Sequence, residues 1–149
     1  MSKWGEFYLI RIEFLGFRYH GWQKQSNFRS IQGMVDKTFE FIFQHNDFKT
    51  HGCGRTDAKV SADDYAFELF LLKGFKIEPE NLLVELNKNL PSDIRAKSIT
   101  EVNSEFNIIQ NSSVKEYHYY FSSGKKSHPF NAPLIRDFGA SLNIEKMEE

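Results

Sequence analysis

Cysteine is nearly absent from this chain. Its 149 residues include one cysteine, Cys53, which excludes a disulfide within one copy and leaves no cysteine cluster for zinc. A single thiol suits a reducing compartment. The histidines lack the spacing of metal ligands; they are His20, His45, His51, His118 and His128. A phosphate-binding P-loop and a dinucleotide fingerprint are also missing. The sequence therefore predicts no metal and no cofactor.

Long hydrophobic runs are missing as well. No run approaches the ~20 residues that a membrane helix needs. The start of the chain, Met1 to Gly5, lacks the apolar core of a secretion signal. We therefore expect a cytoplasmic protein without a membrane span.

An excess of one charge is missing too. The formal net charge of -1 gives no overall attraction to a polyanion, so a nucleic-acid site would have to be a local basic patch. Cations in or near expected loops could supply it: Arg11, Arg18, Lys24, Arg29, Arg55, Lys59, Lys115, Lys125 and Lys126. A solvated surface of mixed charge explains the same residues equally simply.

Aromatic residues, by contrast, are plentiful. The chain has 15 Phe, 6 Tyr and 2 Trp, and 40% of its residues are hydrophobic, which favours a globular domain with an apolar core. Runs rich in β-branched and aromatic residues predict strands at 7–14, 48–53, 65–72, 94–102 and 117–121. Apolar residues at three- and four-residue steps predict helices from Ser30 to about His45, at 79–90 and at 142–149. The stretches 16–29 and 122–133 resemble loops.

This order of elements indicates the fold class. We expect an α+β fold, namely a mainly antiparallel sheet with helices packed on one face, as in ferredoxin-like or RRM-like modules. Residues 1–105 would form this module, and residues 106–149 would contribute a strand, a loop and a helix that begin an incomplete second module.

One polar turn between two apolar strands is the sharpest candidate for chemistry. Its sequence is Gly54-Arg55-Thr56-Asp57-Ala58. A carboxylate two residues from an arginine can be held ionised by charge pairing and local hydrogen bonds, so Asp57 could serve as nucleophile or base. The same residues also fit a structural role without chemistry, in which Asp57 caps the turn and Arg55 pairs at the surface.

Two further segments combine aromatic and polar side chains. In Gly16 to Gln25, aromatic rings, cations and amides interleave on a loop, which is typical of a site for unpaired RNA. Equally, Tyr19 and Trp22 could fold back onto the core. In Lys115 to Tyr119, Tyr117 and Tyr119 would share one face of a strand, either to stack a base or to fill a core.

Together and in this order, these segments resemble the TruA family of tRNA pseudouridine synthases. The resemblance covers roughly residues 7–122. It rests on 16–25 followed by Ser30-Ile31-Gln32-Gly33, on 54–58, on 86–94 and on Tyr117-His118-Tyr119.

The resemblance implies an RNA uridine isomerase that needs no cofactor or metal. Asp57 would be the catalytic aspartate, Arg55 would orient it, and Tyr117 would pack on the target base. The expected RNA contacts are Arg18, Tyr19, Trp22, Gln23, Lys24, Gln25, Thr56, Lys59 and Lys115. The implied substrate is the anticodon stem-loop of tRNA, and the full-length protein would be a homodimer. Because members of the family are longer, we expect this chain to be an N-terminal portion.

The chain also departs from the family pattern. Lys59 stands where the family has glycine, and it would be strained if that position needs a positive φ. Ser61 replaces a histidine, and apolar bulk at 107–109 replaces a polar and basic contact. Glu116 stands where a basic residue is common in the family. These departures leave an alternative open, in which the chain is an inactive tRNA-binding or RNA-binding module with the same fold.

Overall fold

The computed structural model describes residues 2–139 and 142–147. The chain divides after Ser113 into two compact units. By its contacts, segment 106–113 belongs to the first unit, although the sequence analysis assigned it to the second module. The functional division of the chain into modules stays a prediction.

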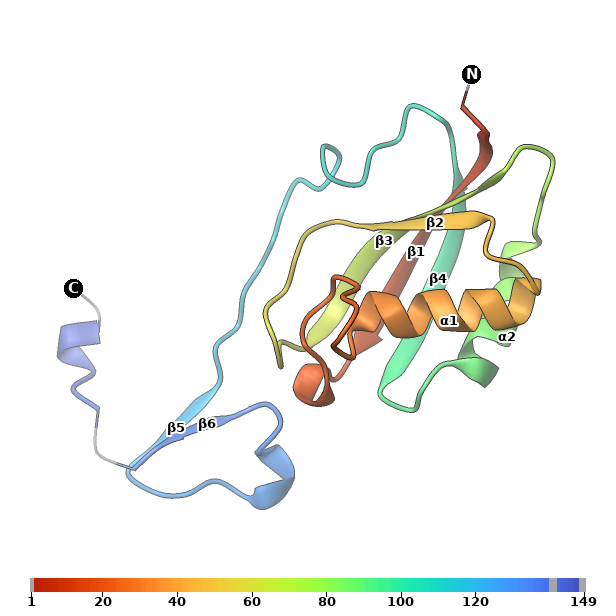
Figure 1. The fold of residues 1–149 in the computed structure, drawn as a ribbon. Coiled ribbons are helices and arrows are strands. Elements are labelled where there is room, and N and C mark those ends of the chain that lie inside the picture. Colours follow the sequence, from red (N-terminus) through yellow and green to blue (C-terminus); the bar gives the residue numbers. More distant parts are fainter. Residues whose placement is uncertain (1, 140–141, 148–149) are drawn as a thin grey trace. The chain divides into compact units, whose positions relative to one another are not determined.

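A four-stranded antiparallel sheet forms the frame of the first unit (Figure 1). The strands lie in the order β2-β3-β1-β4, with bounds Phe48–Gly52, Ala62–Leu72, Trp4–Phe14 and Ile94–Val102. All three pairings are antiparallel. The four strands predicted here from hydrophobic pattern are confirmed, and the fourth has the predicted bounds.

Two helices complete this unit, α1 (Ile31–Phe43) and α2 (Pro79–Asn89). Ser30 begins α1 as predicted, because its hydroxyl accepts a hydrogen bond from the Gly33 amide at 3.2 Å. Gln44 adopts a left-handed conformation that ends the helix. Proline occupies the first turn of α2, where its missing amide hydrogen costs nothing.

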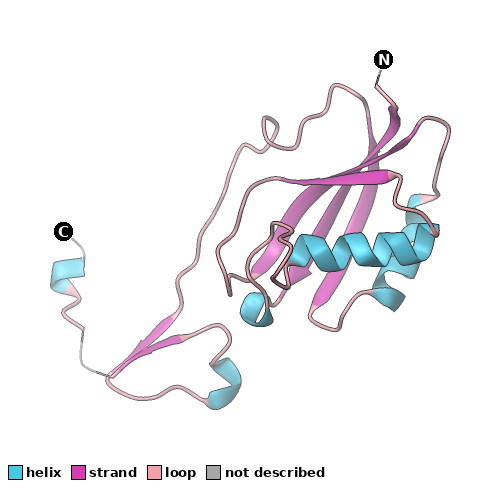
Figure 2. Ribbon diagram, in the orientation of Figure 1, coloured by secondary structure: helices cyan, strands magenta, loops and turns pink. Residues whose placement is uncertain are grey.

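Both helices pack on the same face of the sheet, where they close one hydrophobic core (Figure 2). Alternate residues of β1 and β3 point into this core because side chains along a strand alternate between its faces. Phe67 of β3 and Phe39 of α1 are fully buried there, with ring centroids 6.3 Å apart. The predicted α+β, ferredoxin-like architecture is therefore confirmed.

The opposite face of the sheet carries a buried carboxylate. Glu68 of β3 is only 2% exposed, and it accepts a hydrogen bond from the amide of Ile108 at 3.4 Å. Burial raises the pKa of the Glu68 carboxyl above its ordinary value. The Ile108 side chain is itself buried. Ile108 therefore anchors segment 106–109 against this face of the sheet.

The second unit differs from what its sequence pattern predicts. Its regular elements are two short parallel strands, β5 (Phe121–Ser123) and β6 (Arg136–Phe138), and two short 3-10 helices at Pro129–Asn131 and Glu145–Met147. The strand predicted at 117–121 is confirmed only at its last residue, because β5 begins at Phe121 and residues 114–120 belong to no strand. The Tyr120 carbonyl accepts a hydrogen bond from the Arg136 amide of β6 at 3.0 Å. In the region predicted as helix 142–149, the structure has only the 3-10 turn, and 148–149 lie outside the described residues.

Candidate functional site

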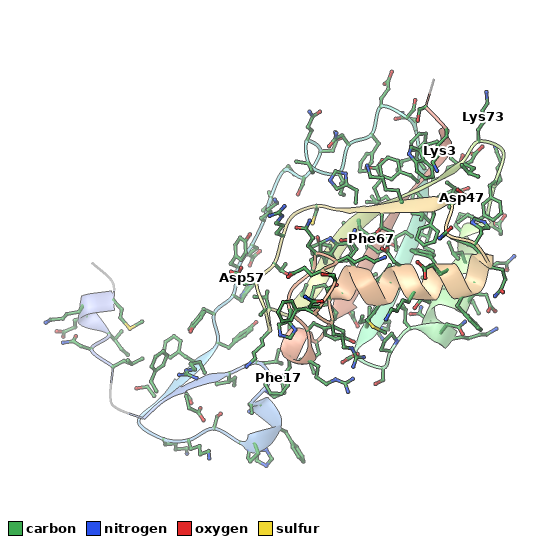
Figure 3. All side chains as sticks on the ribbon, in the orientation of Figure 1. Lys3, Phe17, Asp47, Asp57, Phe67 and Lys73 are labelled. Atoms are coloured by element: carbon green, nitrogen blue, oxygen red, sulfur yellow. The ribbon has the colours of Figure 1, made fainter. Side chains whose placement is uncertain are left out.

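The polar turn that carries Asp57 connects β2 to β3. Figure 3 shows Asp57 at the end of the sheet that lies away from Lys3 and Lys73. Asp57 and Arg55 are both exposed. Within the described residues, neither side chain makes an ion pair or hydrogen bond, so the predicted contact between Arg55 and Asp57 is not formed here. The carboxylate is open to an incoming ligand.

Hydrogen bonds fix this turn to the loop that follows β1. The Trp22 amide donates to the Thr56 hydroxyl at 3.0 Å, and the Lys59 amide donates to the Tyr19 carbonyl at 3.0 Å. Within the turn, the Val60 amide donates to the Asp57 carbonyl at 3.3 Å. Thr56 therefore has a structural role, because its side chain joins two segments that are far apart in sequence.

Gly21 makes this close approach possible. Its φ is +81°, and a Cβ at this position would lie 2.1 Å from the Thr56 carbonyl oxygen. Any other residue would clash with the turn and would also be strained by the left-handed backbone. The glycine thus sets how tightly the loop packs against the segment that bears Asp57.

Lys59 has the positive φ that would strain a residue other than glycine at this position. Its φ is 66°, one of two positive values among non-glycine residues in the described chain. Its ammonium nitrogen lies 5.9 Å from the Phe17 ring centroid. The residue is exposed and adds a cation two positions from Asp57.

Arg18 and Tyr19 are held by Asp93, an aspartate that was not among the predicted site residues. Asp93, just before β4, accepts hydrogen bonds from Arg18 at 2.7 Å and from the Tyr19 hydroxyl at 2.6 Å. Burial acts to raise the pKa of the Asp93 carboxyl, but these hydrogen bonds outweigh it and lower that pKa. Burial and the Asp93 carboxylate raise the pKa of Tyr19 to about 12.

Tyr19 and Trp22 lie in the core, which is the alternative left open for them. Tyr19 is 1% exposed and Trp22 is 3% exposed. The Trp22 ring packs on Tyr65 and Phe67, with centroid separations of 4.5 and 5.4 Å. Apolar rings gain more from this burial than from water contact. Neither ring presents an open face for a base in this structure.

The remaining loop residues of the predicted RNA surface are exposed. Gln23, Lys24 and Gln25 all face solvent. The Lys24 ammonium pairs with the mostly buried Asp36 carboxylate at 3.2 Å, and its backbone amide donates to Gln32 at 2.9 Å. Lys24 is thus a positioned cation with its head group at the surface.

Tyr117 and Lys115 belong to the second unit. Both are exposed, and Tyr117 is 83% exposed. A carboxylate oxygen of Glu116, between them, lies 2.6 Å from Nε2 of His118. The approach of Tyr117 to Asp57 therefore stays a prediction.

Other kinds of site lack support in the described residues. Among them, no three metal-binding side chains of His, Cys, Asp or Glu cluster together. No helix in the described part of the chain is both long enough and apolar enough to cross a bilayer.

Several curated proteins are similar to this chain over most of its length. No family model matches the chain. The tRNA pseudouridine synthase A of Aquifex aeolicus is 35% identical over 138 residues, which make up 93% of this chain and 56% of that protein. That of Thermosipho melanesiensis is 36% identical, over 94% of this chain and 56% of that protein.

A third relative, tRNA pseudouridine synthase A 1 of Protochlamydia amoebophila, is 35% identical over 95% of this chain and 55% of that protein. The chain therefore spans little more than half the length of these curated relatives. It corresponds to an N-terminal portion of a TruA-type tRNA pseudouridine synthase.

Proposed function

We propose that the protein isomerises uridine to pseudouridine in the anticodon stem-loop of tRNA, with Asp57 as its catalytic carboxylate. The observation that carries this proposal is the exposed Asp57 on a turn fixed by hydrogen bonds to Tyr19 and Trp22. Rigid support of a reactive group is what positioning in catalysis requires. The similarity to enzymes with this activity adds independent support.

The chemistry asks little of the protein beyond positioning and one acid-base group. The bond from uracil N1 to C1′ breaks and a bond from C5 to C1′ forms. C5 loses its hydrogen to solvent, N1 gains a proton, and no oxidant or reductant is consumed. A carboxylate beside the sugar can stabilise positive charge at C1′, attack that carbon, or remove the C5 proton.

The substrate must expose its uridine to such a site. A paired base must leave its stack before its C1′ and C5 atoms can be reached. We propose that Tyr117 packs on the displaced base, that Arg55 orients Asp57 once RNA is bound, and that Lys59, Lys115, Arg18, Lys24, Gln23 and Gln25 contact the RNA. A cytoplasmic homodimer is the form in which we expect the protein to act.

The test separates chemistry from binding. In the protein that carries these residues, Asp57→Asn keeps the size of the side chain and removes its charge. We expect pseudouridine formation in an anticodon stem-loop to fall by at least about 10⁴-fold, as when a covalent or acid-base group is lost. Nucleoside chromatography measures turnover, and fluorescence anisotropy measures RNA affinity, which should change less than threefold. Equal losses of affinity and turnover would contradict a chemical role.

A binding module without catalysis is the second candidate. It is favoured by the structural use of residues that depart from the family pattern: Ser61 accepts a hydrogen bond from the Gly16 amide at 2.9 Å, and Ile108 is buried. This candidate predicts tRNA affinity that weakens with salt but no pseudouridine from the wild-type protein. Product formed by the wild type and lost in Asp57→Asn rules it out.

A further inference from the structure

A basic pocket opens beside the first turn of α1, separate from the turn that carries Asp57. It is lined by residues 24–30 together with Gly33, Met34 and Lys37, and its volume is about 640 Å³. That volume lies within the range of sites for small ligands, about 300–1,000 Å³. The pocket can therefore hold one nucleotide unit of a longer chain.

The charge of the pocket is one-sided. Its lining includes Lys24, Arg29 and Lys37 and contains no acidic residue. Lys24 is paired with Asp36, whereas Arg29 and Lys37 form no ion pair within the described residues. The Arg29 guanidinium donates a hydrogen bond to the Tyr19 hydroxyl at 3.4 Å and lies over that ring, and neither contact neutralises its charge. Two cations without an acidic partner in one depression attract an anion, and the planar fork of arginine matches the oxygens of a phosphate group.

An exposed aromatic ring lines the same pocket. Phe28 is 51% exposed, and its ring centroid lies 4.6 Å from that of His20. An open ring beside cations is the combination with which proteins bind unpaired nucleic acid, because every base has a flat face that can stack. Tyr19 and Trp22, which the sequence offered for this role, are buried.

The walls of the pocket are held in place. The His20 amide donates to the Arg29 carbonyl at 2.8 Å, and Gln25 and Phe28 form a backbone bridge. The Gly33 amide is already bonded to the Ser30 hydroxyl, so an anion would be bound by the cationic side chains. A site formed in advance loses little entropy on binding.

We propose that this pocket binds an unpaired nucleotide of the RNA substrate, with its phosphate between Arg29 and Lys37 and its base on Phe28. This inference rests on the proposed function, because that function supplies the RNA that the pocket would bind. Trp22, which bonds the Asp57 turn, and Lys24, which begins the pocket, are two residues apart and thus at most about 7 Å apart between Cα atoms. One RNA strand can therefore continue from the uridine site to the pocket.

The experiment uses two pocket variants and two matched controls in the protein that carries these residues. Phe28→Ala removes the stacking ring and Lys37→Glu reverses one charge. Phe41→Ala and Lys76→Glu make the same changes at exposed positions outside the pocket. Affinity for a hairpin with an unpaired loop and for a fully paired duplex is measured across salt concentrations, and circular dichroism checks that each variant is folded.

We expect Phe28→Ala to weaken hairpin binding by roughly 5- to 100-fold, the effect of losing one base stack, and to leave duplex binding unchanged. Lys37→Glu should weaken binding of both RNAs and lower the salt slope by about one phosphate contact. Both controls should stay within about twofold of wild type. In turnover assays the pocket variants should raise KM while kcat is preserved.

Any one of three results would contradict the proposal that the pocket binds an unpaired nucleotide. Pocket variants could bind the hairpin as the wild type and controls do. Phe28→Ala could weaken duplex and hairpin equally. Inorganic phosphate or free uridine monophosphate could fully displace the hairpin at micromolar concentration, which would indicate a small-molecule site. Asp57→Asn, run in parallel, reports on the proposed function separately, because it abolishes turnover without involving the pocket.

Discussion

At the scale of the residue, local backbone and hydrogen-bond chemistry explain the surroundings of Asp57. Lys59 tolerates a left-handed backbone that glycine would adopt freely. Asp93 joins Arg18 and Tyr19 across 75 and 74 positions of sequence. A single sequence shows neither the hydrogen bonds of Asp93 nor the φ of Lys59. The replacement of a family glycine by Lys59 did indicate where backbone strain would occur.

Lys59→Gly should raise the free energy of unfolding by about 0.5–1 kcal/mol. Relief of the left-handed strain, about 1–2 kcal/mol, exceeds the entropy that glycine loses on folding, about 0.5–1 kcal/mol. Urea denaturation measures the change. Lys59→Ala is the control, because it removes the ammonium contact with Phe17 and keeps the strain. A stability gain in the alanine variant alone would contradict this explanation.

Asp93→Asn should reduce stability at pH 7 by about 1.5–3 kcal/mol, the range for a hydrogen bond to a charged group. Because the folded pKa of Asp93 is lowered, its stabilisation is present above the ordinary aspartate pKa, about 3.9. It is lost as pH falls through the folded value. The stability difference between wild type and variant should therefore shrink below about pH 4. A constant difference down to pH 2 would show that Asp93 ionisation is not responsible.

At the scale of the element, the loop after β1 and the turn between β2 and β3 act as one assembly. Gly21 allows their contact, Trp22 anchors the loop in the core, and Thr56 receives the Trp22 amide. Helix α1 was predictable because Ser30 and the apolar spacing act locally. The strand expected around Tyr117 was not, because a strand also needs a neighbour for its backbone, and alternation of side chains does not supply one.

Gly21→Ala should destabilise the protein by more than about 2 kcal/mol, since it adds a steric clash to a left-handed backbone strain of about 1–2 kcal/mol. Gly74→Ala is a matched control with a similar φ, +84°, and no atom within 4 Å of the added Cβ. It isolates the backbone cost. Equal losses in the two variants, measured by urea unfolding, would show that close approach to Thr56 carries no energetic weight.

At the scale of the whole molecule, the fold of the first unit and the position of the Asp57 turn were readable from sequence. The α+β order followed from hydrophobic period, and the turn stood out as polar residues between apolar strands. The destination of individual aromatic rings was not readable: Trp22 entered the core, while Phe28 remained exposed. Composition treats these rings alike, and only tertiary packing separates them.

The central claim is that the Asp57 carboxylate drives exchange of the N1 and C5 bonds at C1′ of one uridine. When C5 bonds to C1′ it releases its hydrogen, so RNA tritiated at C5 of uridine reports each turnover as tritium in water. With an anticodon stem-loop, we predict one tritium released per pseudouridine formed by the wild-type protein and none above background with Asp57→Asn. Tritium release by Asp57→Asn at the wild-type rate would contradict the account.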